Sequence, residues 1–284
     1  MAHKPANQIR SLLRAPSQPK LREEDAGATP LRDNKRDPDL SKAQLKERER
    51  ALTLQLTDQL AVCQEMLYAE HKRKVLLVLQ GMDTSGKDGT VTALFSRINP
   101  MGLRAVGFKA PTAAELAHDF LWRVHPHVPV AGEIAIFNRS HYEDVLITRV
   151  QDLIDDKECK RRYAQILDFE RMLAETGTVI VKVFLHISKD EQRERLQARL
   201  DDPEKQWKFD PNDLVQRKKW DAYQRAYERA IAATDTEHAP WYIIPADSKT
   251  HRNLLIAHLL LEVMQDMQLS FPAPNPAMST LEID

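Results

Sequence analysis

The chain has 284 residues, 42% of them hydrophobic, which is enough for one large α/β core with some length left over for arms. Its 41 lysines and arginines balance 42 aspartates and glutamates to a net charge of -1, so no global positive field argues for wrapping duplex nucleic acid. No run reaches the ~18 apolar residues that span a bilayer, and no apolar signal core opens the sequence. We expect a cytoplasmic protein with neither nucleic-acid nor membrane partners.

The first third of the chain predicts an arm, a long helix and a buried strand. Residues 1–40 mix proline, arginine, lysine and aspartate with few large apolar groups, which favours a flexible arm. Residues 41–72 predict a long helix, because Ser41 is a suitable N-cap and leucines recur at helical spacing. The short apolar run 75–79 predicts a buried strand, and a helix is expected over 88–99.

Strands and helices then alternate to the end of the chain. Further strands are predicted at 103–108, 133–137, 178–185 and 241–244, with helices at 112–125, 141–150, 156–176 and 248–267. This alternation predicts one α/β domain over 41–268, with a parallel five-stranded sheet, helices on both faces and ligands at the carboxyl ends of the strands. A highly charged helical insertion fills 188–233, and a proline-rich tail occupies 269–284.

A glycine-framed loop follows the first strand. Gly81, Gly86 and Lys87 keep the spacing of the P-loop, in which backbone N–H groups surround phosphate and the lysine supplies positive charge. An acid inside the loop, Asp83, would repel phosphate unless a cation lay between them. We therefore expect Mg²⁺ here, or Mn²⁺ in its place. The residues expected to bind phosphate are Gly81, Thr84, Ser85, Gly86, Lys87, Asp88, Gly89 and Thr90, although Asp88 stands where the usual pattern has Ser or Thr.

The third strand ends in a second polar cluster, beginning at Asn138. In P-loop enzymes this position usually offers an acid for Mg²⁺, so the metal charge must be balanced largely by Asp83, with Asp144 or Glu143 helping through water. Arg139 suits a bidentate grip on phosphate. His141 is interpreted as a hydrogen-bonding neighbour in preference to a covalent phosphate carrier.

The insertion at 188–233 carries many basic residues interleaved with acids. By itself such a run is typical of a solvated helical face. In nucleotide kinases, however, an insertion before the last strand is a mobile lid that closes arginines over the phosphates. The lid cations expected to bind phosphate are Arg193, Arg199 and Lys208. Because the insertion holds more cations than one triphosphate needs, it suits a longer polyanion.

Six blocks of the sequence resemble those of the polyphosphate kinase 2 family. They cover about residues 40–268 in order, at 81–90, 108–112, 117–123, 136–145, 218–223 and 239–247. The resemblance implies a P-loop kinase-like three-layer sandwich with a helical lid. It also implies Mg²⁺-dependent phosphoryl transfer between inorganic polyphosphate and AMP or ADP, without a covalent phosphoenzyme. The loop and strand-end blocks are most similar to class III members, which phosphorylate both AMP and ADP.

Matching positions carry the family's site residues onto this chain. Asp83, Lys87 and Arg139 correspond to its catalytic residues, with Asp83 and Asp144 as metal ligands. Lys109, Asp119, Asn138 and Arg139 are expected at the nucleotide site. We also expect GMP and GDP as further acceptors, and a homodimer or homotetramer as the assembly.

Two alternatives stay open. An ATP-dependent nucleoside monophosphate kinase would have the same fold. A non-catalytic polyanion-binding module would use the basic arm, which contains Arg10, Arg14, Lys20 and Arg22. The Asn-Lys-Arg-Asp sequence at 34–37 matches a guanine-binding motif of GTP-binding switches, but it precedes the P-loop and is interpreted as a coincidence.

Overall fold

The computed structural model describes residues 8–32 and 40–276. At its centre is a parallel sheet of five strands in the order β2-β3-β1-β4-β5. The strands are β1 (Lys74–Gln80), β2 (Leu103–Gly107), β3 (Ile134–Asn138), β4 (Thr178–His186) and β5 (Trp241–Pro245). Every predicted strand is confirmed to within one residue at each end.

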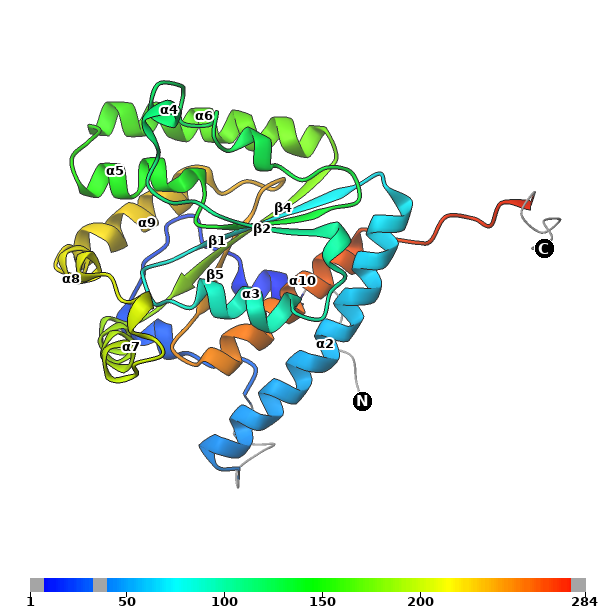
Figure 1. Cartoon of the computed structure of the whole chain (residues 1–284), viewed down its shortest axis with the longest axis horizontal. Helices are drawn as coiled ribbons and strands as arrows, with labels where there is room; N and C mark the ends of the chain where they lie inside the picture. Colours follow the sequence, from blue (N-terminus) through cyan, green and yellow to red (C-terminus); the bar gives the residue numbers. More distant parts are fainter. Residues whose placement is uncertain (1–7, 33–39, 277–284) are drawn as a thin grey trace.

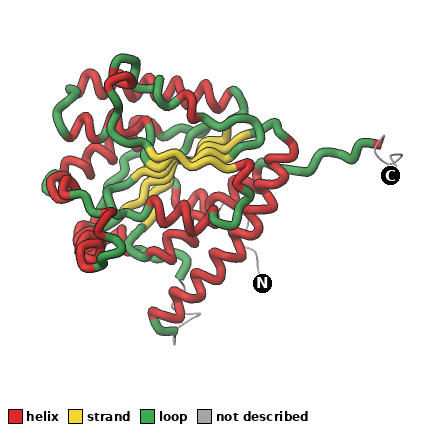
Figure 2. The backbone as a smooth tube through the Cα atoms, viewed as in Figure 1, coloured by secondary structure: helices red, strands yellow, loops and turns green. Residues whose placement is uncertain are grey.

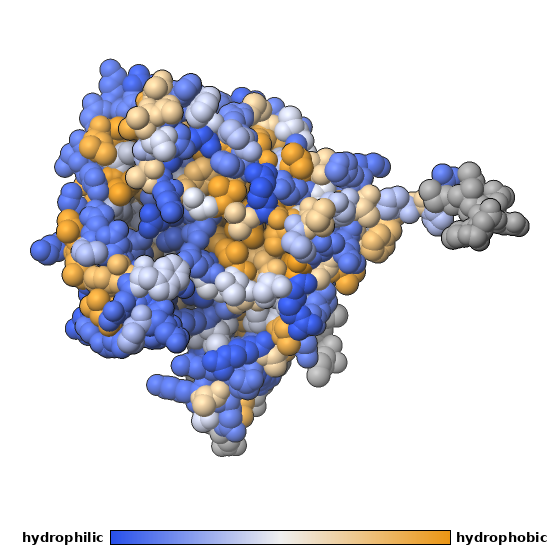
Figure 3. All heavy atoms as spheres, viewed as in Figure 1, coloured by the Kyte–Doolittle hydropathy of each residue, from blue (hydrophilic) through white to orange (hydrophobic). Residues whose placement is uncertain are grey.

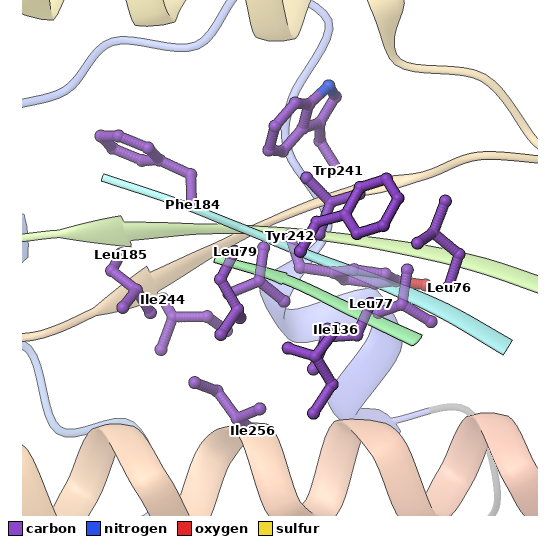
Figure 4. Close-up of a cluster of buried hydrophobic side chains, with 14 of the residues drawn as sticks. Leu76, Leu77, Leu79, Ile136, Phe184, Leu185, Trp241, Tyr242, Ile244 and Ile256 are labelled. Atoms are coloured by element: carbon purple, nitrogen blue, oxygen red, sulfur yellow. The ribbon is translucent and has the colours of Figure 1, made fainter. Parts of the chain in front are cut away.

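Helices cover both faces of this sheet, which makes a three-layer sandwich (Figures 1 and 2). One layer holds α2 (Lys42–Glu70), α3 (Lys87–Phe95) and α10 (Lys249–Asp266), and the other holds α6 (Asp156–Glu175) and α9 (Trp220–Thr234). In Figure 4, Leu185 and Ile244 point toward Ile256 of α10, whereas Phe184 and Trp241 point to the opposite face. The predicted fold class is confirmed.

The sheet order places the two polar clusters side by side. Strand β1 lies between β3 and β4, and Leu79 of β1 pairs with Asn138 of β3. Because both strands run in the same direction, the loop after β1 and the turn after β3 leave the same edge of the sheet. This edge faces α7 (Lys189–Asp201) and α8 (Pro211–Arg217) (Figure 1).

Two helix predictions are wrong. The expected helix over 112–125 is only α4 (Ala113–Leu116), followed after a turn by the 3-10 helix His125–His127. The chain leaves the helix because the Asp119 carboxylate accepts the backbone N–H of Leu121, a local bond that competes with helical ones. The expected helix over 141–150 is a 3-10 helix, His141–Val145, followed by the short α5 (Ile147–Val150).

The N-terminal segment is not a free arm over residues 8–32. Its short α1 (Gln8–Leu13) buries Leu13, and the Ala15 N–H donates to the Trp241 carbonyl at 2.9 Å. Arg14 is fixed by Asp235 at 2.9 Å. Apolar groups, a backbone bond to β5 and several ion pairs therefore attach this polar segment to the domain. The Asn-Lys-Arg-Asp motif at 34–37 lies outside the described residues.

The charged insertion divides into two parts. α9 buries Trp220, Tyr223 and Tyr227 in the core, so its residues belong to the sandwich and the expected lid boundary at 233 is too late. α7, the 3-10 helix Gln206–Lys208 and α8 extend from the core, and Trp207 is 78% exposed. We keep the name lid for residues 188–219. None of the helices in the described part of the chain is long and apolar enough to cross a membrane.

Candidate active site

The loop after β1 has the backbone of a phosphate cradle. Gly81 has a φ of 151°, and a side chain there would approach the Leu185 carbonyl to 2.8 Å. Gly86 has a φ of 105° and immediately precedes α3. The helix therefore begins at Lys87 with its N-terminal N–H groups and the positive end of its dipole directed at the loop, as an anion site requires.

Lys87 lies at the centre of this loop. Its ammonium donates to the carbonyl oxygens of Gly81 at 2.6 Å and Met82 at 3.2 Å, and its side chain is buried. Burial, reinforced by the nearby Arg139 charge, lowers the pKa of Lys87 to about 8. Among the described residues, the hydrogen-bond partners of this ammonium are carbonyl groups, so its charge is well placed to receive an anion.

Three hydroxyl groups around the lysine lack partners. The side-chain oxygens of Thr84, Ser85 and Thr90 are buried, and none finds a hydrogen-bond partner among the described residues. A buried hydroxyl without a partner costs free energy. Phosphate oxygens in the loop would satisfy these donors, so the cradle fits the predicted ligand.

An ion pair links the loop to the end of β3. Arg139 Nη2 donates to Asp83 Oδ1 at 2.5 Å. The backbone of Arg139 has a φ of 61°, a region that residues other than glycine rarely adopt, so the turn holds this side chain at some cost. Burial acts to lower the pKa of Arg139, but the carboxylates of Asp83 and Glu143 outweigh it and raise this pKa.

The acid beside the loop is Glu143, not Asp144. The Gln80 amide lies 3.0 Å from the Glu143 carboxylate, to which it donates when oriented to satisfy both groups. Burial raises the pKa of Glu143, against the opposing charges of Arg139 and Lys87. The carboxylate of Asp144 accepts from Arg123 at 3.2 Å and is 3.9 Å from Arg162, and its metal role stays a prediction.

The donor set suits a divalent cation shared with substrate. The described residues contain no cluster of three or more His, Cys, Asp or Glu side chains able to hold a metal by themselves. Mg²⁺ is commonly held by one or two carboxylates together with phosphate oxygens and water. Asp83 offers such a carboxylate, with the buried hydroxyls nearby. Asn138 instead donates to Asp88 at 2.5 Å, so both are engaged with each other.

The predicted lid cations bond within the lid. Arg193 is 3.6 Å from Asp190, and Lys208 lies over the Trp207 ring. Arg199 donates to the Lys208 carbonyl and is 3.6 Å from Asp213. Burial and the nearby Asp83 charge raise the pKa of Asp213 to about 6. Arg217 of α8 donates to Gln192 at 2.9 Å, and Gln192 donates to the Asp83 carbonyl, which links α8 to the loop. A recess lined by hydrophilic residues lies between α7 and the α4–α5 region (Figure 3).

The predicted nucleotide residues Lys109 and Asp119 are exposed on the segment between β2 and β3. The Lys109 carbonyl accepts from Arg123 at 2.8 Å, which ties this segment to Asp144. Their contact with a nucleotide stays a prediction.

Three residues at the loop were missed from the sequence. Gln192 donates to the Asp83 carbonyl at 3.0 Å, and Arg195 and Arg252 donate to carbonyls of Thr84 and Ser85. No sequence pattern singles out Gln192 or Arg252. Arg195 belongs to the run of basic residues in the insertion at 188–233 and has no distinguishing sequence signal, but it is buried against the loop.

Comparison with known proteins identifies relatives along most of the chain. Residues 42–272 match the family model described as Polyphosphate kinase 2 (PPK2). The AMP/ADP-polyphosphate phosphotransferase of Meiothermus ruber is 54% identical over 229 residues, which is 81% of this chain and 86% of that protein. The ADP-polyphosphate phosphotransferase of Rhodopseudomonas palustris is 43% identical, over 82% of this chain and 84% of that protein.

A solved structure agrees with the fold. The crystal structure of Polyphosphate Kinase 2 from Arthrobacter aurescens TC1 superposes with a TM-score of 0.87 at 43% identity. The match covers 98% of this chain and 97% of that one.

Proposed function

The chain belongs to the polyphosphate kinase 2 family, and we infer that it is a polyphosphate-dependent nucleotide kinase, which moves phosphoryl groups between inorganic polyphosphate and AMP or ADP. The relative from Meiothermus ruber is named for both acceptors, which supports class III behaviour for this chain. We include GMP and GDP as acceptors and a homodimer or homotetramer as the assembly.

The observation that carries this proposal is the meeting of Asp83 and Arg139 above a loop with buried, unpartnered hydroxyls. An acid and an arginine thus face the position where the phosphate cradle would hold the transferred group. The lid supplies further cations at the same edge of the sheet. Such an arrangement suits a donor whose charge extends beyond a single triphosphate.

The proposed reaction is an in-line transfer between two phosphate groups. A nucleotide phosphate is already an anionic nucleophile, so positioning and charge neutralisation matter more than a strong base. Lys87, the loop N–H groups and Arg139 stabilise the charge on the transferred group. Asp83 would hold the divalent cation or orient the attacking phosphate. When bound, Mg²⁺, or Mn²⁺ in its place, would neutralise phosphate charge beside Asp83.

The burial of His141 supports a direct transfer without a phosphoenzyme. Its side chain is fully buried, and its Nε2 lies 3.3 Å from the Glu170 carboxylate. A phosphate carrier must reach donor and acceptor in turn, which this position does not allow. Outside the loop, we propose that Arg193, Arg199 and Lys208 bind polyphosphate, and that Lys109, Asp119 and Asn138 line the acceptor site.

The test is a product profile from the purified chain. AMP, ADP, GMP and GDP are each supplied with polyphosphate as the only donor, with Mg²⁺ or Mn²⁺. We expect ADP and ATP from AMP, and ATP from ADP. An enzyme that phosphorylates AMP with ATP but makes nothing from polyphosphate would instead be an ATP-dependent nucleoside monophosphate kinase.

A further inference from the structure

Two buried arginines pack against the rear of the phosphate loop. Arg252, in the first turn of α10, is only 2% exposed and donates to the Ser85 carbonyl at 3.0 Å. A side-chain carbon added at Gly86 would lie 1.8 Å from the Arg252 guanidinium. The loop backbone therefore rests directly on this group, and the glycine is required by the contact as well as by its φ.

Arg195 joins the same loop to the end of β5. One of its guanidinium nitrogens donates to the carbonyls of Thr84 at 2.9 Å and Ser85 at 3.1 Å. The other donates to the carbonyls of Ala246 at 2.7 Å and Asp247 at 2.8 Å. A planar guanidinium can span two such pairs, whereas an ammonium cannot. The Ser85 carbonyl thus accepts from both arginines.

This shared carbonyl fixes the peptide that opens the helix. The described chain contains no cis peptide bond, so the Gly86 N–H points opposite to the Ser85 carbonyl. With that carbonyl drawn rearward by two cations, the Gly86 N–H is directed into the cradle. The neighbouring Ser85 N–H is already used, because it donates to the Met82 carbonyl.

The two arginines differ in how their charge is balanced. Arg195 pairs with Glu191 at 2.7 Å. Within residues 8–32 and 40–276, no carboxylate forms an ion pair with Arg252, and its side chain otherwise meets only the Asn253 amide oxygen. Burial and the nearby Arg195 charge lower the pKa of Arg252 to about 9. A buried cation without a counter-ion lowers the stability of the fold unless a bound anion neutralises its charge.

We propose that Arg195 and Arg252 are positioning residues that turn the Ser85–Gly86 peptide toward the transferred phosphate, and that bound phosphate supplies the counter-charge of Arg252. The identity of the anion rests on the proposed function. The orientation of the peptide rests only on the contacts described above. Neither arginine touches substrate in this account, since both act through the loop backbone.

The test compares Arg252→Met, Arg252→Lys and a matched control, Arg104→Met. Arg104, on the edge strand β2, is a partly buried arginine paired with Glu133 at 2.8 Å, and among the described residues it has no bond to the loop. The Kd for inorganic tripolyphosphate is measured by calorimetry, and kcat and KM are measured with polyphosphate and ADP. Because loss of a charge-assisted bond is involved, we expect Arg252→Met to raise the Kd about tenfold or more.

The lysine variant separates charge from geometry. Arg252→Lys keeps the charge but loses the fork, so the Kd should stay within about threefold of the wild-type value while kcat falls about tenfold. Arg104→Met should lower the unfolding temperature without changing the Kd. A folded Arg252→Met variant with wild-type Kd and kcat would overturn the inference. If that variant does not fold, Arg252→Lys and Arg195→Lys decide, and wild-type kcat in both would overturn it.

The design also separates this inference from the proposed function. Wild-type enzyme that binds tripolyphosphate but forms no nucleotide product would refute the function. A raised Kd for tripolyphosphate in Arg252→Met would still support the proposed role of Arg252 in positioning the loop.

Discussion

The guanidinium of Arg139 meets the carboxylate of Asp83 at 2.5 Å, where the carboxyl ends of β3 and β1 lie side by side. Asp83 lies in the loop after β1 and Arg139 in the turn after β3, and the register of these two strands places the two segments side by side. The Arg139 guanidinium neutralises the charge of Asp83. We expect oxygens of a bound phosphate to compete for the same guanidinium, which would release the Asp83 carboxylate for a cation or for the acceptor.

This relationship predicts the effect of Asp83→Asn. The amide is nearly the same size as the carboxylate and still accepts a hydrogen bond from Arg139, so the fold should persist. It cannot neutralise a divalent cation, and we expect ATP formation from ADP and polyphosphate to fall by at least about 100-fold. Circular dichroism and thermal unfolding check the fold. Near-normal turnover would exclude Asp83 from the mechanism.

Replacing Lys87 should lower the transfer activity and raise the free energy of unfolding. Lys87→Met removes the central positive charge, so transfer should fall by at least about 100-fold. The pKa of Lys87 is about 8 in the folded chain against an ordinary 10.5, a difference that corresponds to roughly 3 kcal/mol of unfavourable burial as an upper bound. The carbonyls of Gly81 and Met82 lose their donor. We therefore expect a net gain of about 1 kcal/mol in the free energy of unfolding at pH 7.

The pH dependence gives this prediction a second readout. Between pH 8 and 10.5 the unfolded chain binds the Lys87 proton more strongly than the folded chain does, so wild-type stability rises with pH through this window. The Lys87→Met variant lacks this pH-dependent contribution to stability. Urea unfolding of both proteins should show the advantage of Lys87→Met shrinking from pH 7 to pH 9.5. A constant difference would contradict the altered pKa.

Much of the architecture follows from the sequence because its signals are local. Short apolar runs predict the strands, and the helices α2, α6 and α10 follow from helical patterns in the sequence, with Ser41 as the N-cap of α2. The helix expected over 112–125 fails because the Asp119 carboxylate caps a new turn. The arm prediction fails for residues 8–32 because Leu13 packs in the core and Arg14 pairs with Asp235, through contacts distant in sequence.

The site shows a similar division. The glycine spacing predicts the cradle, and the sheet order brings Asp83 to Arg139. The 3-10 helix His141–Val145 determines that Glu143, and not Asp144, faces the loop. No sequence pattern predicts this turn. Hydrogen bonds from buried arginines to loop carbonyls also leave no periodic pattern in the sequence. The contact of Arg252 with the loop is therefore seen only in the structure.

The proposed lid predicts a selective effect of Arg193→Ala. The side chain of Arg193 is 67% exposed and is only 3.6 Å from Asp190, so its removal should leave the fold intact. If it grips the polymer, the KM for polyphosphate should rise about fivefold or more, while the KM for AMP stays constant. Arg171→Ala is the control, because Arg171 is an exposed, ion-paired arginine on α6. Equal effects on both substrates would count against a polymer-binding lid.

Asp213 should weaken polyphosphate binding at neutral pH, because it occupies the lid cation Arg199. Its carboxylate faces Arg199 at 3.6 Å and feels the Asp83 charge. Asp213→Asn would free Arg199 for polyphosphate and remove a negative charge from the edge of the cradle. We expect the KM for polyphosphate at pH 7 to fall about two- to fivefold. Asp201→Asn, elsewhere in the lid, should have no effect.

The raised pKa of Asp213, about 6, fixes the pH range of this effect. A raised folded pKa means that stability from the protonated form is lost as pH rises through 6. Below that value wild-type Asp213 is itself neutral, so the difference from Asp213→Asn should shrink at pH 5.5. A KM that is unchanged, or that rises, at pH 7 would contradict this role of Asp213.

A buried ion pair behind the β3 turn provides the last prediction. Lys182 donates to Glu170 at 2.6 Å, to the Tyr142 hydroxyl at 2.9 Å and to the Thr234 carbonyl at 2.8 Å. Both charged side chains are fully buried. Lys182→Met would leave Glu170 charged and without its main partner, which typically costs about 3–5 kcal/mol.

The double variant tests whether charge is the cause. Lys182→Met with Glu170→Gln removes both charges, so most of the lost stability should return in urea unfolding at pH 7. Burial acts to raise the pKa of Glu170, but Lys182 and His141 outweigh it and lower it. Wild-type protein therefore loses this stability as pH falls through the folded pKa, whereas Lys182→Met gains from protonation of Glu170. The gap between them should narrow from pH 7 to pH 4. A gap that stays constant would mean that Lys182 stabilises the core through packing alone.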